Sequence, residues 1–139
     1  DVSIQSQILA EVRRLATDTG TAFIWVTHDL AVVSSLADDI CVMYAGRVVE
    51  TGPAEAVIAA PRHPYTAGLL ASVPSEHVPG SRLPQVPGAA PVLSALPTGC
   101  SFAPRCPRAA AVWSTPVPVQ QFEDGRTALC HIPITPPAR

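Results

Sequence analysis

The first twenty residues carry apolar side chains at helical spacing. These apolar positions recur every three or four residues, with polar and charged residues between them, as an amphipathic helix requires. They are Ile4, Ile8, Leu9, Val12 and Leu15. Gly20 follows the pattern and suits a helix C-terminal cap, because glycine adopts a positive φ without strain. The pattern predicts one amphipathic helix that ends before residue 20.

The next apolar run, residues 22–26 (AFIWV), is short and rich in β-forming side chains. Its continuous apolar character predicts a strand that is covered on both faces, as in a parallel sheet. Thr27, His28 and Asp29 follow at the carboxyl end of this strand. Asp29 is a residue type that caps helices, and it precedes a second predicted helix over residues 30–36.

Two further β-rich runs, residues 40–44 and 47–51, flank the turn Ala45-Gly46. This arrangement predicts an antiparallel hairpin. Gly52-Pro53 ends the hairpin and begins a short helix over residues 54–59. A last helix is predicted over residues 66–71, with His63 and Tyr65 ordering the turn before it. Cys41 lies in the first strand of the hairpin, and we expect it to pack in the core as a buried free cysteine.

All sixteen prolines lie after residue 52. Proline removes a backbone donor and breaks regular pairing, so residues 73–139 are predicted to form mostly loops. The alternation of strand and helix before that point gives residues 1–72 an α/β character.

Composition excludes several classes of function. The formal charge is −2, whereas a protein that binds nucleic acid through phosphates normally has a basic excess. All nine basic residues are arginine, so the chain contains no P-loop lysine and no Schiff-base lysine. No run approaches the ~18 apolar residues of a membrane span. The chain begins at Asp1 without a Met, and we expect a soluble piece of a longer protein.

His28 is the first candidate for chemistry. In an open α/β sheet, ligands bind outside the carboxyl ends of the strands, and His28 follows the predicted strand 22–26. An imidazole there is placed to contact a phosphate or an attacking water. The alternative is a loop histidine satisfied by a neighbouring carboxylate, and spacing alone does not choose between the two.

Five segments resemble one known family. Residues 23–33 (FIWVTHDLAVV) and 37–52 (ADDICVMYAGRVVETG) closely resemble the end of an ABC transporter ATP-binding subunit. Residues 61–74 (PRHPYTAGLLASVP), 82–88 (RLPQVPG) and 96–107 (LPTGCSFAPRCP) narrow the resemblance to the dipeptide/oligopeptide importer branch. Together with the opening residues 1–3, which resemble the end of the family's D-loop, these segments are distributed over most of the chain.

The resemblance implies a fold and two parts. The fold class is α/β, with the C-terminal portion of an ABC-type P-loop ATPase domain in residues 1–60, containing the D-loop end, the H-loop and a late hairpin. A Pro-rich, loop-dominated oligopeptide-transporter C-terminal extension follows in residues 61–139. The resemblance makes His28 the switch histidine, which contacts the γ-phosphate of ATP and helps to position the hydrolytic water. It makes Asp1 part of the D-loop, which communicates with the second ATP-binding subunit.

The resemblance also implies cofactors, partners and a location. The intact protein would use ATP and Mg²⁺ and would pair with a second ATP-binding subunit as a homo- or heterodimer. This pair would drive transmembrane permease subunits, to which a separate peptide-binding protein delivers the substrate. It would lie peripherally on the cytoplasmic face of the cell membrane, and nucleic acid is not a partner. The family's Walker A, Q-loop, signature and Walker B motifs precede the D-loop, so we expect the chain alone neither to bind nor to hydrolyse ATP.

Three cysteines of the tail form a separate candidate site. Cys100, Cys106 and Cys130 match three of the four positions that hold an iron–sulfur cluster in some members of the branch, and Trp113 occupies the fourth. Such clusters normally use four thiolates. The alternatives are a zinc site completed by His131, a three-thiolate cluster with an exogenous ligand, and a site without metal whose volume Trp113 fills.

A rival function follows from these cysteines. The chain would then be a non-catalytic metal- or iron–sulfur-binding interaction domain that folds and works without an ATPase. Metal bound to the isolated chain distinguishes this rival from the ATPase interpretation, because metal binding supplies folding free energy to a domain of this kind.

Overall fold

The computed structural model describes residues 2–74, 77–109 and 113–135 of the 139-residue chain. The chain divides into two compact units, Asp1–Asp38 and Asp39–Arg139. Within the described residues, no helix combines the length and the apolar character needed to cross a membrane.

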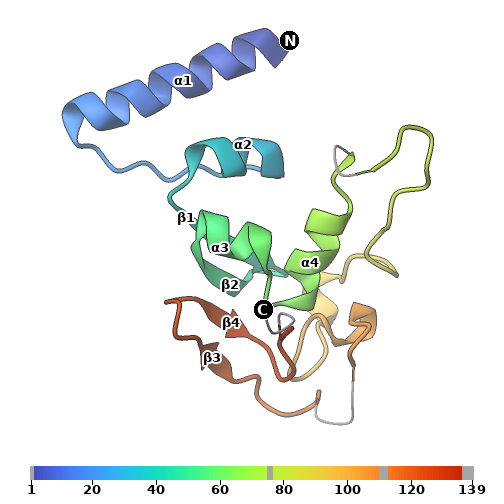
Figure 1. The fold of residues 1–139 in the computed structure, drawn as a ribbon. Helices are drawn as coiled ribbons and strands as arrows, with labels where there is room; N and C mark the ends of the chain where they lie inside the picture. Colours follow the sequence, from blue (N-terminus) through green and yellow to red (C-terminus); the bar gives the residue numbers. More distant parts are fainter. Residues whose placement is uncertain (1, 75–76, 110–112, 136–139) are drawn as a thin grey trace. The chain divides into compact units, whose positions relative to one another are not determined.

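The first unit consists of two helices joined by an extended segment (Figure 1). Helix α1 spans Val2–Thr19 and is followed by Gly20 at a φ of 65°, as the sequence predicts. Helix α2 spans Leu30–Leu36, which confirms the second predicted helix. The Arg13 guanidinium on α1 donates a hydrogen bond of 2.9 Å to the carbonyl oxygen of Ser35 on α2.

The predicted strand at residues 22–26 is not formed. Residues 21–27 are extended and irregular, and Ile24 and Val26 are 96% and 92% exposed. A strand exists only when neighbouring backbones accept and donate its hydrogen bonds. Among the described residues no segment pairs with this one, so its β-forming composition alone does not make it a strand.

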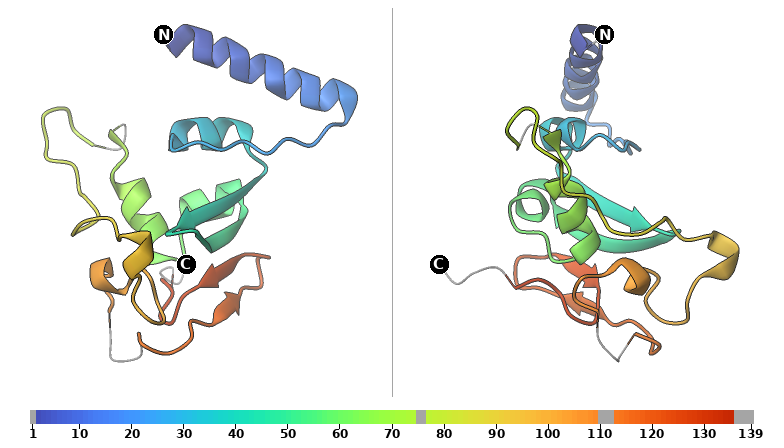
Figure 2. Two further views of the ribbon diagram at one scale, coloured as in Figure 1. Left: turned by 180° about the vertical axis from the view of Figure 1, so that it is seen from behind. Right: turned by 90° about the vertical axis from the view of Figure 1, so that its right-hand side faces the viewer.

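The second unit contains a four-stranded antiparallel sheet in the order β1-β2-β4-β3 (Figures 1 and 2). Strands β1 (Asp39–Tyr44) and β2 (Arg47–Pro53) form the predicted hairpin. Its turn places Ala45 and Gly46 at φ values of 49° and 75°, the positive values that tight hairpin turns use.

The expectation that residues 73–139 are mostly loops is wrong at one place. Strands β3 (Val119–Gln121) and β4 (Thr127–Leu129) form a second hairpin, and β4 pairs with β2 through Glu50–Ala128 and Thr51–Thr127. The strands are only three residues long, so they show no periodic pattern of their own. The tail also contains the 3₁₀ turns Leu93–Ala95 and Ala103–Arg105.

Helices α3 (Ala54–Ala59) and α4 (Pro64–Ala71) follow β2 along the chain. The first has its predicted bounds, and the second begins two residues earlier than the 66–71 prediction because Pro64 suits the first turn,. The side chain of His63 caps α4 by accepting a hydrogen bond of 3.0 Å from the backbone N–H of Tyr65. His63 and Tyr65 therefore order this turn as the sequence suggests.

An aromatic cluster forms the core between the first hairpin, α4 and the tail. The rings of Tyr44, Tyr65 and Phe102 lie 4.6 to 5.5 Å apart, and Phe102 is 2% exposed. The Arg105 guanidinium lies over the Tyr44 ring and donates to the carbonyl oxygens of Val86 and Pro87 at 3.3 and 2.8 Å. Arg105 thereby holds the proline-rich segment around Val86 and Pro87 next to strand β1.

Cys41 does not pack in the core. Strand β1 alternates between exposed and buried positions, and Cys41 falls on the exposed face between buried Ile40 and Val42. Side chains of a strand alternate between two faces. A β-rich run with one covered face therefore sends every second apolar residue to solvent, whatever its residue type.

Candidate functional site

His28 lies at the bend between the extended segment and α2, with its side chain exposed. No hydrogen bond joins this imidazole to another of the described residues. A neutral imidazole offers one donor and one acceptor, and a charged one offers two donors. His28 can therefore bind a phosphate oxygen or orient a water molecule that approaches α2 from solvent.

The two neighbours of His28 are fixed by hydrogen bonds. The backbone N–H of Asp29 donates to Thr27 Oγ1 at 3.0 Å. Asp29 caps α2 as predicted: its Oδ1 accepts from the N–H of Val32 at 3.4 Å, and its carbonyl oxygen accepts from the N–H of Val33 at 3.2 Å. Asp1, the residue expected to act in the D-loop, lies outside the described residues.

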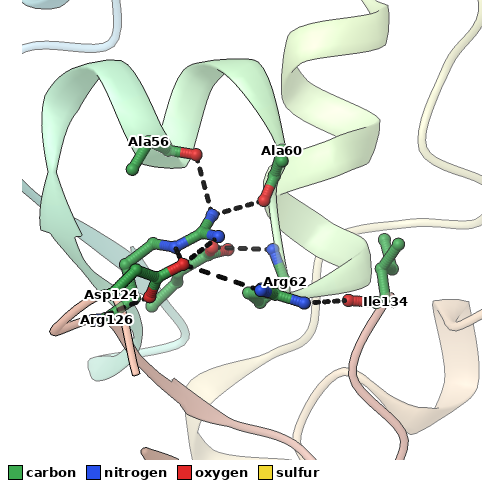
Figure 3. Close-up of polar contacts among 7 residues, drawn as sticks. Ala56, Ala60, Arg62, Asp124, Arg126 and Ile134 are labelled. Carbon is green, nitrogen blue, oxygen red and sulfur yellow. Dashed lines mark hydrogen bonds and ion pairs between the residues drawn. The ribbon is translucent and has the colours of Figure 1, made fainter. Parts of the chain in front are cut away.

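A polar cluster centred on Arg126 joins the β3–β4 hairpin of the tail to α3. This guanidinium is 4% exposed and donates to the carbonyl oxygens of Ala56, at 2.7 Å, and of Ala60 (Figure 3). The Ala56 carbonyl also accepts from the N–H of Ala60, the C-cap of α3, at 3.1 Å, whereas the Ala60 carbonyl lies at the helix end, where backbone acceptors lack partners within the helix. Asp124 holds Arg126 from the other side through bonds of 2.9 and 2.6 Å to Nε and Nη2.

Arg62 extends this cluster toward the end of the described chain. Its guanidinium lies 3.6 Å from Asp124 Oδ2 and 4.5 Å from the ring centre of Phe122, and it donates to the Ile134 carbonyl oxygen at 3.4 Å (Figure 3). The hydrogen bond from Arg126, with the charges of Arg126 and Arg62, lowers the pKa of Asp124 to about 2.

Glu50 is the buried carboxylate of the same region. It is 0% exposed, and its two oxygens accept from the backbone N–H groups of Arg62 and His63 at 2.7 and 2.9 Å. Sequence reasoning missed Glu50, Asp124 and Arg126. The one available signal was a glutamate within the β-rich run 47–51, a position where a carboxylate needs dedicated donors.

The side chain of His63 titrates well below its ordinary range. It is 1% exposed, and burial lowers its pKa from 6.5 to about 4. Its Nδ1 accepts from the N–H of Tyr65, so the proton of the neutral ring is on Nε2. His63 is therefore a neutral structural residue at physiological pH.

Acid should destabilise the fold through His63. The unfolded chain binds a proton near pH 6.5 and the folded chain only near pH 4. Stability from this group is thus complete above pH 6.5 and falls by about 3 kcal/mol as pH drops to 4. Urea unfolding at pH 7, 5.5 and 4.5 measures how the free energy of unfolding changes with pH. His63→Asn keeps a capping oxygen but does not titrate, so it should reduce this pH dependence, whereas His77→Asn should leave it unchanged. Equal slopes for wild type and His63→Asn would contradict the assignment.

The three tail cysteines lie within electrostatic reach of one another. Burial raises the pKa of Cys130 to about 11, and the nearby Cys100 and Cys106 raise it further. A hydrogen bond from the backbone N–H of Ile132 acts in the opposite direction and lowers this pKa. Burial also raises the pKa of Cys106. Trp113, at the fourth ligand position, accepts from the N–H of Cys100 through its carbonyl oxygen at 3.0 Å.

These cysteines do not fit a metal centre as arranged. Over the described ranges, no group of three or more His, Cys, Asp or Glu side chains has a geometry that holds a metal ion. The adjoining cavity, which includes Arg47, His63 and Cys100 in its lining, is about 10 Å³, room for about one water molecule.

Comparisons with known proteins agree with the segments described above. Residues 49–112 match the family described as "Oligopeptide/dipeptide transporter, C-terminal region". The chain is 42% identical over 134 residues to the oligopeptide transport ATP-binding protein OppD of Escherichia coli (strain K12), covering 96% of this chain and 40% of that protein. OppD of Salmonella typhimurium (strain LT2) gives the same identity and coverage.

The match runs through both units of the chain, whereas the chain spans only about 40% of the length of these relatives. The family's C-terminal region begins in β2 and includes α3, α4 and the proline-rich segment. Residues 49–112 therefore carry the C-terminal region of the oligopeptide/dipeptide transporter family, and the chain as a whole is similar to the C-terminal part of oligopeptide transport ATP-binding proteins.

Proposed function

We propose that the complete subunit containing this chain binds and hydrolyses ATP, with Mg²⁺, to drive the import of oligopeptides or dipeptides. The support is the naming of the relatives as oligopeptide transport ATP-binding proteins and the family match of residues 49–112. ATP hydrolysis in such a site depends on positioning and electrostatic stabilisation around the γ-phosphate.

His28 is the residue of this chain that acts in hydrolysis, as a contact to the γ-phosphate and a positioner of the attacking water. One observation carries this role: the imidazole is exposed at a bend whose two neighbouring residues are fixed by hydrogen bonds. A donor held in place before the reaction stabilises developing charge without reorganising. Asp1 takes the D-loop role, which links the two ATP sites.

The remaining assignments form one assembly. Residues 1–60 complete the ATPase domain and residues 61–139 form the transporter-specific extension. The subunit pairs with a second ATP-binding subunit at the cytoplasmic face of the membrane. Two permease subunits receive the energy of hydrolysis, and a peptide-binding protein delivers the substrate. The 139-residue chain alone lacks a phosphate-binding lysine, and it neither binds nor hydrolyses ATP.

Peptide-stimulated ATP hydrolysis by the reconstituted transporter tests the proposed function. The complete subunit, assembled with its permease subunits and binding protein in vesicles, should hydrolyse ATP faster when a peptide is supplied and should accumulate that peptide inside the vesicle. The isolated 139-residue chain is the control and should show neither hydrolysis nor micromolar ATP binding. Hydrolysis that no peptide stimulates, with no uptake, would contradict the proposal.

A further inference from the structure

The direction of the His28 side chain is set by its backbone. The imidazole is exposed and bonds to none of the described side chains or carbonyls. Two side-chain torsions then remain, and both start from the Cα–Cβ bond. The φ and ψ of residue 28 decide where that bond points, so whatever fixes these two angles also aims the ring.

Thr27 fixes the backbone on one side of His28. Its Oγ1 accepts from the N–H of Asp29 at 3.0 Å, which closes a side-chain turn around the His28 peptide units. A β-branched residue has a restricted χ1, and Thr27 is partly buried. The acceptor oxygen is therefore held where the turn needs it.

Asp29 fixes the other side, through α2. Its Oδ1 and its carbonyl oxygen accept from the N–H groups of Val32 and Val33, so the residue after His28 belongs to the helix cap. Helix α2 is itself anchored: Val32 is 5% exposed, and Arg13 of α1 donates to the Ser35 carbonyl oxygen at 2.9 Å.

We infer that Thr27 and Asp29 are positioning residues that aim the His28 imidazole at the γ-phosphate. The inference rests on the proposed role of His28 and adds two residues that act through the orientation of its ring. Loss of either hydrogen bond frees the φ and ψ of residue 28, and the ring then samples directions away from the reacting atoms. A misplacement of about 1 Å can reduce a rate by roughly two orders of magnitude.

The test is steady-state ATP hydrolysis by the assembled transporter carrying Thr27→Val, which removes the acceptor and keeps the shape. We expect kcat to fall roughly tenfold or more while the KM for ATP stays within about twofold, because the loss appears only in the transition state. Thr27→Ser restores the oxygen and should recover most of the rate. Asp29→Ala and Asp29→Asn form a second pair, since asparagine also caps helices.

The matched control is Thr21→Val, which removes an exposed hydroxyl that accepts a hydrogen bond of 2.8 Å from Thr19 Oγ1 and should leave kcat unchanged. A wild-type kcat in Thr27→Val, or a loss that Thr27→Ser fails to repair, would overturn the inference. His28→Ala is measured alongside. If His28→Ala is fully active, the proposed role of His28 has failed. If it is inactive while Thr27→Val is normal, only the positioning inference has failed.

Discussion

Replacing Arg126 by Ala should lower the free energy of unfolding by about 2–3 kcal/mol, because a buried guanidinium loses its hydrogen bonds to two carbonyl oxygens and to a carboxylate. The guanidinium is 4% exposed and bonds to the Ala56 and Ala60 carbonyl oxygens and to Asp124. Its removal leaves the Ala60 carbonyl oxygen without the Arg126 donor and leaves Asp124 without its closest positive charge. The tail hairpin then loses its polar connection to α3.

Urea unfolding followed by circular dichroism measures this loss. Arg126→Lys keeps the charge but cannot serve acceptors on two sides at once, so its stability should fall between those of Arg126→Ala and wild type. Arg82→Ala removes an exposed arginine and should change stability by less than about 0.5 kcal/mol. An Arg126→Ala protein as stable as Arg82→Ala would show that this cluster does not hold the tail in place.

Gly52 explains why Arg126 can approach so closely. Residue 52 has a φ of 151°, and a Cβ there would lie 2.3 Å from Arg126 Cγ. The sequence suggests only that Gly52-Pro53 ends a strand. The structure adds that the missing side chain makes room for an arginine more than seventy residues further along the chain.

Replacing His28 by Ala should reduce the kcat of ATP hydrolysis by about 10²–10³, the typical loss when one fixed donor to a developing charge is removed. The imidazole contacts the γ-phosphate and the attacking water in the proposed site, so its contribution grows as negative charge moves during the reaction. The KM for ATP should change little, because the lost contact strengthens only in the transition state.

His77→Ala is the matched control for His28→Ala. His77 belongs to the second unit, and its ring forms a hydrogen bond of 2.7 Å with the Ala71 carbonyl oxygen. Its replacement should leave kcat and the KM for ATP at wild-type values. Equal losses in the two variants would point to a general effect of histidine removal and against a specific role of His28.

Local signals in the sequence predict much of this structure. The helical spacing before Gly20, the cap at Asp29, and the Ala45-Gly46 turn each depend on residues within a few positions of one another. The resemblance likewise depends on contiguous segments, such as Thr27-His28-Asp29 and residues 96–107. Features encoded this way are visible without tertiary contacts.

The features that sequence reasoning missed depend on distant partners. Residues 22–26 have strand-forming composition but no paired strand among the described residues. Strand β4 has three residues, two of which pair with β2 residues more than seventy positions earlier in the chain. Cys41 is exposed because only one face of β1 is covered. Arg126 can be buried because α3 offers carbonyl acceptors to its guanidinium. The sequence around residue 126 contains no pattern that predicts these distant acceptors.

A single-turnover experiment with the complete subunit tests the role of His28 most directly. The assembled transporter is mixed with γ-labelled ATP in the presence of Mg²⁺ and peptide, and released phosphate is followed in time. His28→Ala should retain bound ATP in the closed state and release phosphate about 10²–10³-fold more slowly than wild type. Phosphate release at the wild-type rate by His28→Ala would contradict the claim that this chain supplies the switch histidine of a peptide-importing ATPase.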